Sequence, residues 1–187
     1  MGFYEIIFDG HRAKFGSGSF VSMKKLKNSY IVLFISMGLV SCLPEANYPI
    51  EPVIKFIAFD ISEDNTAVLS IEFTDGDGDL GLNSSDILPP FCSTCDHHFN
   101  LMCEYDELRD GEWTHIPLVP AQGQVPFYYR VPRVNPSGSN PALKGVIEIA
   151  MNTWSLQSEY DTLRYRITLE DRGLNLSNED TTIVILK

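Results

Sequence analysis

Residues 42–187 of this sequence contain few basic side chains. Of the 14 Lys and Arg residues, 5 lie in residues 1–41, and of the 25 Asp and Glu residues, 2 lie there. The rest of the chain therefore carries 9 basic and 23 acidic residues, a net charge of −14. A surface with this charge repels nucleic acid and anionic headgroups. It suits cation binding, or solubility outside the cytoplasm, and we expect no nucleic-acid partner.

The sequence also lacks a long apolar run and a helical hydrophobic period. The apolar run Tyr30–Val40 is far shorter than the roughly 20 residues that a membrane-spanning helix needs. No Ser-His-Asp order stands out, and no Gly-rich phosphate loop opens a helix. These absences favour an all-β protein that is not an enzyme.

The segment from Met23 has the layout of a secretory signal peptide. Lys24, Lys25 and Lys27 form a basic start before the apolar run, which small residues close just before Cys42. We therefore assign residues 23–41 to a signal peptide. Residues 1–22 precede a complete signal and are interpreted as an extension produced by a wrongly chosen start codon.

The ending Leu39-Val40-Ser41-Cys42 resembles the lipobox of bacterial lipoproteins. The resemblance implies cleavage before Cys42 and acylation of that residue, which makes the bilayer the first expected partner. It places the protein in the cell envelope, as a lipoprotein of the outer membrane. Residues 42–52 follow as the lipidated cysteine and a Pro-rich tether.

The rest of the chain, residues 53–187, shows strand patterns along its length. This length is typical of a single domain. The alternation of apolar and polar residues is sharpest in Thr66–Thr74 and Thr162–Glu170. "RDGEW" (Arg109–Trp113) predicts a tight hairpin turn. About eight antiparallel strands with one buried face predict an immunoglobulin-like β-sandwich. The predicted strands are Val53–Asp60, Thr66–Thr74, Phe99–Leu108, Glu112–Val119, Phe127–Pro132, Lys144–Met151, Thr162–Glu170 and Thr181–Leu186.

In such a sandwich, alternate connections share one pole. The loops Asp75–His98, Arg133–Leu143 and Asp171–Asp180 are the long, polar ones. We therefore expect them to lie together and to carry any functional site, because loops on a rigid scaffold carry function.

Several motifs of residues 53–187 resemble those of one protein family. They are "DGDGDLGL" after a strand, "LPPF", "LKGVIEI" and "DTLRYRITLEDRGLNLSN". Together with the lipobox they are similar to a family of uncharacterised bacterial lipoproteins with one immunoglobulin-like domain and a DGDGDIG-type loop. The resemblance implies the fold and the anchor, and it implies no activity.

The loop "FTDGDGDLGL" places three aspartates at alternate positions. Asp75, Asp77 and Asp79 fit the first, third and fifth positions of a helix-loop-helix calcium loop, but the sixth is Leu80 and the flanks are strands. Carboxylate and carbonyl oxygens suit Ca²⁺. A turn whose aspartates cap their own amides, or a catalytic pair, are the alternatives. The candidate ligands are Asp75, Asp77, Asp79, Asn83, Asp86, Asp171, Asn175 and Asn178.

A second group of candidate residues lies in "CSTCDHHFNLMC". By count and spacing, Cys92, Cys95, His97, His98 and Cys103 could form a zinc or copper site. In an oxidising compartment, Cys92 and Cys95 can instead form a disulfide or remain free thiols. Cys103 shares its strand face with Phe99, Leu101 and Tyr105, which favours a place in the core.

These observations leave three functional hypotheses. The first is a membrane-anchored module, stabilised by calcium, that presents its pole loops to a protein or glycan. The second is a periplasmic protein that handles zinc or copper through the Cys/His loop. The third is a hydrolase that uses Asp77 or Asp79.

Overall fold

The computed structural model describes residues 4–7, 47–120, 123–136 and 140–187. The regular elements in these ranges are all β-strands, and no helix among them could cross a membrane. The predicted signal peptide (23–41) and the predicted lipidation site Cys42 lie outside the described residues.

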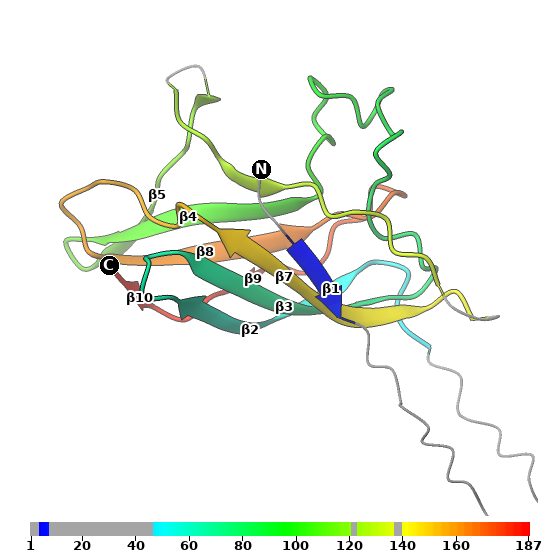
Figure 1. Ribbon diagram of the computed structural model, residues 1–187, viewed down its shortest axis with the longest axis horizontal. Coiled ribbons are helices and arrows are strands. Elements are labelled where there is room, and N and C mark those ends of the chain that lie inside the picture. Colours follow the sequence, from blue (N-terminus) through cyan, green and yellow to red (C-terminus); the bar gives the residue numbers. More distant parts are fainter. Residues whose placement is uncertain (1–3, 8–46, 121–122, 137–139) are drawn as a thin grey trace, which may run out of the picture. The chain divides into compact units, whose positions relative to one another are not determined.

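Four antiparallel strands form the first sheet, in the order β1-β7-β3-β2 (Figure 1). Their bounds are Tyr4–Ile7 (β1), Val53–Ile61 (β2), Ala67–Asp75 (β3) and Leu143–Met151 (β7). In β3 the residues expected on one face, Ala67, Leu69, Ile71 and Phe73, are all buried. The period-2 pattern therefore assigned the inward face of this strand correctly.

The second sheet is built on β4 (Leu101–Arg109) and β8 (Thr162–Leu169), which pair antiparallel. On its other side, each of these two long strands pairs with two short strands, one after the other along its length. The edge of β4 is paired with β5 (Glu112–His115) and β6 (Phe127–Tyr129). The edge of β8 is paired with β9 (Asp180–Thr181) and β10 (Ile185–Leu186).

Aromatic rings fill the space between the two sheets. Phe59 of the first sheet lies 5.8 Å, between ring centroids, from Tyr165 of the second. Tyr165 also contacts Tyr105 at 5.6 Å, and Trp154 meets Phe59 at 5.9 Å. The two sheets therefore pack face to face, and the fold is a β-sandwich with an immunoglobulin-like arrangement, as the sequence predicted.

Three predicted strands end earlier, or divide, for identifiable reasons. The pairing of β5 continues to Ile116 and stops at Pro117, which has no N–H to donate. Strand pairing does not continue after β6, because the Val131 N–H donates to a side chain instead of to a neighbouring strand. The acceptor is Asn100 Oδ1, at 2.6 Å. The last predicted strand is divided into β9 and β10, between which the Thr182 hydroxyl accepts from the Tyr165 N–H at 3.0 Å.

Asp110 and Gly111 have φ values of 52° and 84°, so the Asp-Gly hairpin turn is confirmed. Phe99 was expected on the buried face of its strand, and this was wrong. The strand begins at Leu101, and the Phe99 side chain is 40% exposed, beside His98 and Tyr128.

The N-terminal strand β1 also departs from expectation. Residues 1–22 are predicted to be an extension outside the fold, whereas Tyr4–Ile7 pairs with Val146–Ile149 of β7. Where translation starts stays a prediction. The consequence for the fold is that β1 covers the outer edge of β7.

The three long loops lie at the same end of the sandwich, as predicted. Val134 and Arg133 of the β6–β7 connection bond to the backbones of Leu80 and Leu82 in the β3–β4 loop. Arg172 of the β8–β9 loop is ion-paired with Asp86 of the β3–β4 loop. This end of the sandwich, hereafter the loop pole, carries the candidate site.

Candidate functional site: an aspartate cluster at the loop pole

The site begins where β3 ends. Asp75 is the last residue of this strand, and its Oδ2 accepts a hydrogen bond from the Leu80 N–H at 3.0 Å. Leu80 is completely buried and anchors the loop in the core. Gly78 has a φ of +70°, which lets the chain turn between Asp77 and Asp79. The alternating glycines and the buried leucine thus bring three aspartates into one turn.

Neighbouring segments press closely on this turn. A Cβ atom placed on Gly76 would lie 2.3 Å from the carbonyl oxygen of Tyr48, and one on Gly78 would lie 1.9 Å from that of Pro141. Both distances are too short for a side chain. Glycine is therefore required at these two positions for the tether and the β6–β7 loop to pack against the turn.

A fourth aspartate joins the turn from the β8–β9 loop. Asp171 directly follows Glu170 and is 1% exposed. Its Oδ1 accepts from the Asn175 N–H, and its Oδ2 accepts from the Asn175 side-chain amide, both at 2.8 Å. Asn175 therefore orients the Asp171 carboxylate toward the turn.

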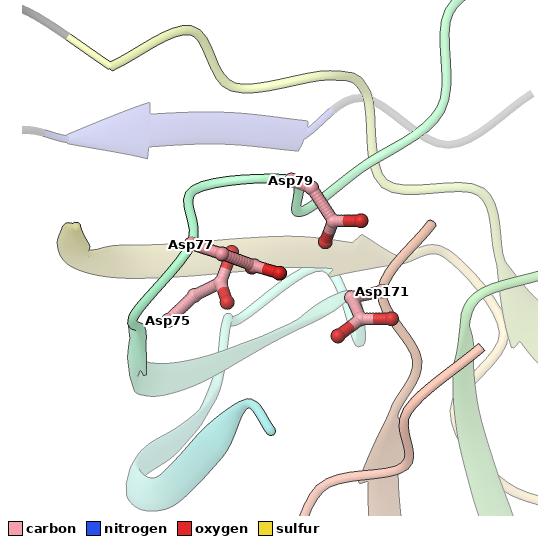
Figure 2. A group of neighbouring side chains, drawn as sticks. All are labelled: Asp75, Asp77, Asp79 and Asp171. Carbon is pink, nitrogen blue, oxygen red and sulfur yellow. The ribbon is translucent and has the colours of Figure 1, made fainter. Parts of the chain in front are cut away.

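The four carboxylates converge on one space (Figure 2). One oxygen from each of Asp75, Asp77, Asp79 and Asp171 lies within 4.8 Å of the others. Calcium binds oxygens at about 2.3–2.6 Å, so two ligands on opposite sides of the ion are about 4.6–5.2 Å apart. The four oxygens are thus close enough to belong to a single calcium coordination shell.

Two oxygens of this cluster are buried without a hydrogen-bond partner among the described residues. They are Asp75 Oδ1 and Asp79 Oδ1, and Asp75 as a whole is 0% exposed. A buried carboxylate oxygen that bonds to nothing costs free energy. The arrangement therefore favours a bound proton or cation at this place.

The electrostatics of the cluster lead to the same conclusion. Burial, and next the charge of Asp77, raise the pKa of Asp75 to about 7, and the charges of Asp79 and Asp171 add to the shift. Burial and the charges of Asp171 and Asp77 also raise the pKa of Asp79, while the Arg172 N–H and the Arg133 charge oppose them. Without a cation, two of the four carboxyl groups are thus harder to ionise than usual.

Sequence reasoning did not find Arg133, which braces the turn from outside. Its guanidinium donates to the carbonyl oxygens of Gly78 and Asp79. No motif in "VPRVNP" signals this role, because it depends on the β6–β7 loop folding back onto the turn. Arg133 holds the two backbone carbonyls and leaves the carboxylates facing the common space.

Two predicted calcium ligands, Asp86 and Asn178, have side-chain partners outside the cluster. Asp86 accepts the Asn83 N–H at 2.7 Å and is ion-paired with Arg172, whose hydrogen bond lowers the pKa of Asp86. Asn178 is bonded to the backbone of Ile54. The side chains of Asp86 and Asn178 therefore serve the loop framework here, and Asn83 joins it through its backbone N–H, while Asn175 touches the cluster through Asp171.

The Cys/His group is not gathered into a metal site. Cys92 and Cys95 form a disulfide, and Cys103 is buried in β4, where burial raises the pKa of its thiol. His97 Nδ1 lies 2.8 Å from Glu170 Oε1, and His98 Nδ1 lies 3.3 Å from the Phe91 carbonyl oxygen. Among the described residues, the aspartate cluster is the only group of three or more acidic, His or Cys side chains placed to hold one metal ion.

Comparisons of the chain with protein-family models, with curated proteins and with solved structures gave no match in any of the three.

Proposed function

We propose that this protein is a membrane-anchored module of the cell envelope whose loop pole is stabilised by a bound calcium ion. The observation that carries the proposal is that four carboxylates converge on one space. Two of their oxygens, Asp75 Oδ1 and Asp79 Oδ1, are buried there without a hydrogen-bond partner among the described residues. A divalent cation would remove the repulsion between these groups and bond the unpartnered oxygens. Hard carboxylate oxygens, with no nitrogen or sulfur donor among them, favour Ca²⁺ over Zn²⁺, which prefers nitrogen and sulfur.

The anchor is the second part of the proposal, and it rests on the lipobox resemblance at Cys42. The disulfide between Cys92 and Cys95 supports an oxidising compartment outside the cytoplasm. The module binds a protein or glycan through the loops at its pole and performs no reaction. In this role, calcium holds the β3–β4 and β8–β9 loops in one arrangement and so preorganises the binding surface.

Thermal unfolding tests the calcium site. Extracellular calcium modules have Kd values of about 10⁻⁴–10⁻³ M. About 5 mM Ca²⁺ should therefore stabilise the folded chain by about 1–2 kcal/mol relative to EDTA, a rise of a few degrees in Tm. Mg²⁺ should give less, because it keeps its water ligands and demands a tighter octahedral geometry.

Two matched variants separate the site from general charge effects. Asp77→Asn removes one carboxylate from the cluster, and Asp96→Asn removes one from an exposed position in the same loop. Only Asp77→Asn should abolish the calcium response. Elemental analysis of the purified protein should find calcium and no zinc or copper. Identical melting curves in Ca²⁺ and EDTA, with both variants behaving alike, would overturn the proposal.

A further inference from the structure

The two outer edges of the first sheet are protected in different ways. Along β2, the Asn178 side chain bonds to both backbone groups of Ile54, and Asp180 Oδ2 accepts from the Phe56 N–H at 2.6 Å. The register of β2 also shifts between Phe56 and Ala58. Capping side chains and bulges are the usual means by which proteins close a sheet edge.

The edge of β7 is instead covered by β1 (Figure 1). Tyr4–Ile7 pairs antiparallel with Val146–Ile149. The proposed cleavage before Cys42 would separate this strand from the mature chain. The backbone groups of β7 that β1 occupies would then be open to another strand.

We propose that in the mature lipoprotein a second copy of the chain takes the place of β1, by antiparallel pairing of β7 with β7. The inference rests on the processing at Cys42 that the proposed function includes. The two first sheets would join into one continuous sheet across a twofold axis. Such an interface is isologous, because the same residues contribute from both copies.

The outward face of β7 is complementary to itself in this arrangement. With the axis at Val146, Lys144 lies opposite Glu148 of the second copy, and Glu148 lies opposite its Lys144. Opposite charges placed directly across an antiparallel pair stabilise it. Lys144 is exposed and already carries an ion pair with Glu72 at 2.8 Å on the β3 side, so its ammonium group would lie between two carboxylates.

The inward face is complementary in size. In the same register, Gly145 lies opposite Ile147 of the second copy, so a large side chain faces a residue with none. Ile147 and Ile149 are 0% and 1% exposed. The apolar row of β7 would thus continue across the axis without crowding.

The end of β7 offers the second copy a further contact. A pocket of about 570 Å³ opens here, lined largely by apolar side chains, among them Phe99, Val125, Tyr128, Ala150 and Met151. Val125 is 80% exposed and Phe99 is 40% exposed. The register that centres on Val146 brings Pro141 and Ala142 of the second copy opposite Met151 and Ala150, at the mouth of this pocket. The contact would cover apolar surface that the single chain leaves in water.

Cysteine cross-linking tests the pairing in the full chain, expressed in a bacterium that processes lipoproteins. Val146→Cys places a thiol on the twofold axis, where it meets its own copy. Val68→Cys is the matched control, because Val68 is also half-buried and on the outward face but belongs to β3, one strand inside the edge. Mild oxidation should convert Val146→Cys into a species of twice the monomer mass and leave Val68→Cys monomeric.

A charge exchange gives an independent readout. Lys144→Glu alone should abolish the dimer, because it sets carboxylates opposite each other. Lys144→Glu combined with Glu148→Lys should restore it, because the pairs re-form with exchanged signs. Light scattering in detergent measures the mass, and the melting temperature shows that each variant is folded.

Mass spectrometry of the N-terminus separates the possible failures. A chain that begins at Cys42 but gives no cross-link at Val146, or one to a different protein, overturns the β7 dimer and leaves the calcium module standing. A chain that retains β1 overturns the proposed processing, and the dimer with it.

Discussion

Asn178 is bonded to Ile54 as a strand residue would be: its Oδ1 accepts from the Ile54 N–H at 2.9 Å and its Nδ2 donates to the Ile54 carbonyl at 3.0 Å. This side chain fastens the segment after β8 to the edge of β2. The sequence had offered it as a calcium ligand, and the two roles predict different responses to mutation.

Asn178→Ala should lower the free energy of unfolding by about 1–2 kcal/mol, because two hydrogen bonds to one buried residue are lost. The increase in stability that calcium produces should stay as large as in the parent chain. Urea unfolding with and without Ca²⁺ measures both quantities. Loss of the calcium increment in this variant would return Asn178 to the list of ligands.

The stability of the calcium-free protein should fall as the pH rises from about 4 to about 7. The pKa of Asp75 is about 7 in the folded chain, against 3.8 for the ordinary side chain. The folded state therefore binds more protons than the unfolded state within this window, and the stability that this proton contributes is lost as the pH passes the folded pKa.

Asp75→Asn should flatten this part of the profile while keeping the oxygen that accepts from Leu80. The measurement is urea unfolding in EDTA at several values between about pH 4.5 and 7.5. If parent and variant have the same slope, Asp75 does not titrate in this range. Calcium should act most strongly near pH 7.5, where protons no longer compete for the carboxylate.

Gly78→Ala should be much more destabilising than Gly111→Ala. Both residues have positive φ values, +70° and +84°, so both variants bear the cost of about 1–2 kcal/mol for an L-residue in that conformation. Only at Gly78 does the new Cβ meet an atom, the Pro141 carbonyl oxygen at 1.9 Å, whereas at Gly111 nothing lies within 4 Å. Thermal unfolding of the two variants compares them. Equal losses would show that the β6–β7 loop does not press on the turn.

Cys42→Ser should move the protein from the detergent phase to the aqueous phase in a Triton X-114 partition. The reason is that the acyl chains are the only strongly membrane-binding group that the sequence predicts. Mass spectrometry of the parent protein should find diacylglyceryl-cysteine at its N-terminus. A parent that partitions like the variant would rule out the anchor.

Lys187→Met should destabilise the fold by about 1–3 kcal/mol. The Lys187 ammonium donates to the carbonyl oxygens of Leu156 and Tyr160, at 2.8 and 2.7 Å, and lies 3.3 Å from Glu107 Oε1. Glu107 is 0% exposed, so losing a cationic partner is costly. Lys55→Met on the exposed face of β2 is the control and should change stability little. Similar melting temperatures for the two variants would contradict the prediction.

Local pattern was sufficient to predict most of the sandwich. The burial alternates strictly in β8, and in β3 it is broken only at Ser70, so a period of two identifies both strands and their inward sides. The loop pole also followed from topology alone, since alternate connections return to the same end. Asp75 and Asp171, which are far apart in sequence, were brought together on that ground.

The roles that the sequence did not reveal depend on contacts distant in sequence. Nothing near Asn178 shows that it will pair with Ile54, and nothing near Asp86 shows that Arg172 will reach it. Both side chains look like free oxygen donors until the partner loop is in place. The strand β1 escaped notice because the sequence before Met23 was interpreted as surplus, and four residues carry too short a pattern to predict pairing.

The close approach of Tyr48 to Gly76 also limits the distance between the aspartate cluster and the proposed anchor at Cys42. Six residue steps separate Cys42 from Tyr48, which allows at most about 20 Å of extended chain. If Cys42 is acylated as proposed, the aspartates remain close to the headgroup layer. An anionic leaflet near −30 mV concentrates a divalent ion about tenfold at its surface, and this excess decays over about 8 Å at physiological ionic strength. If the tether holds the cluster within about 8 Å of the leaflet, its apparent calcium affinity would depend on the lipid composition as well as on the dissolved ion.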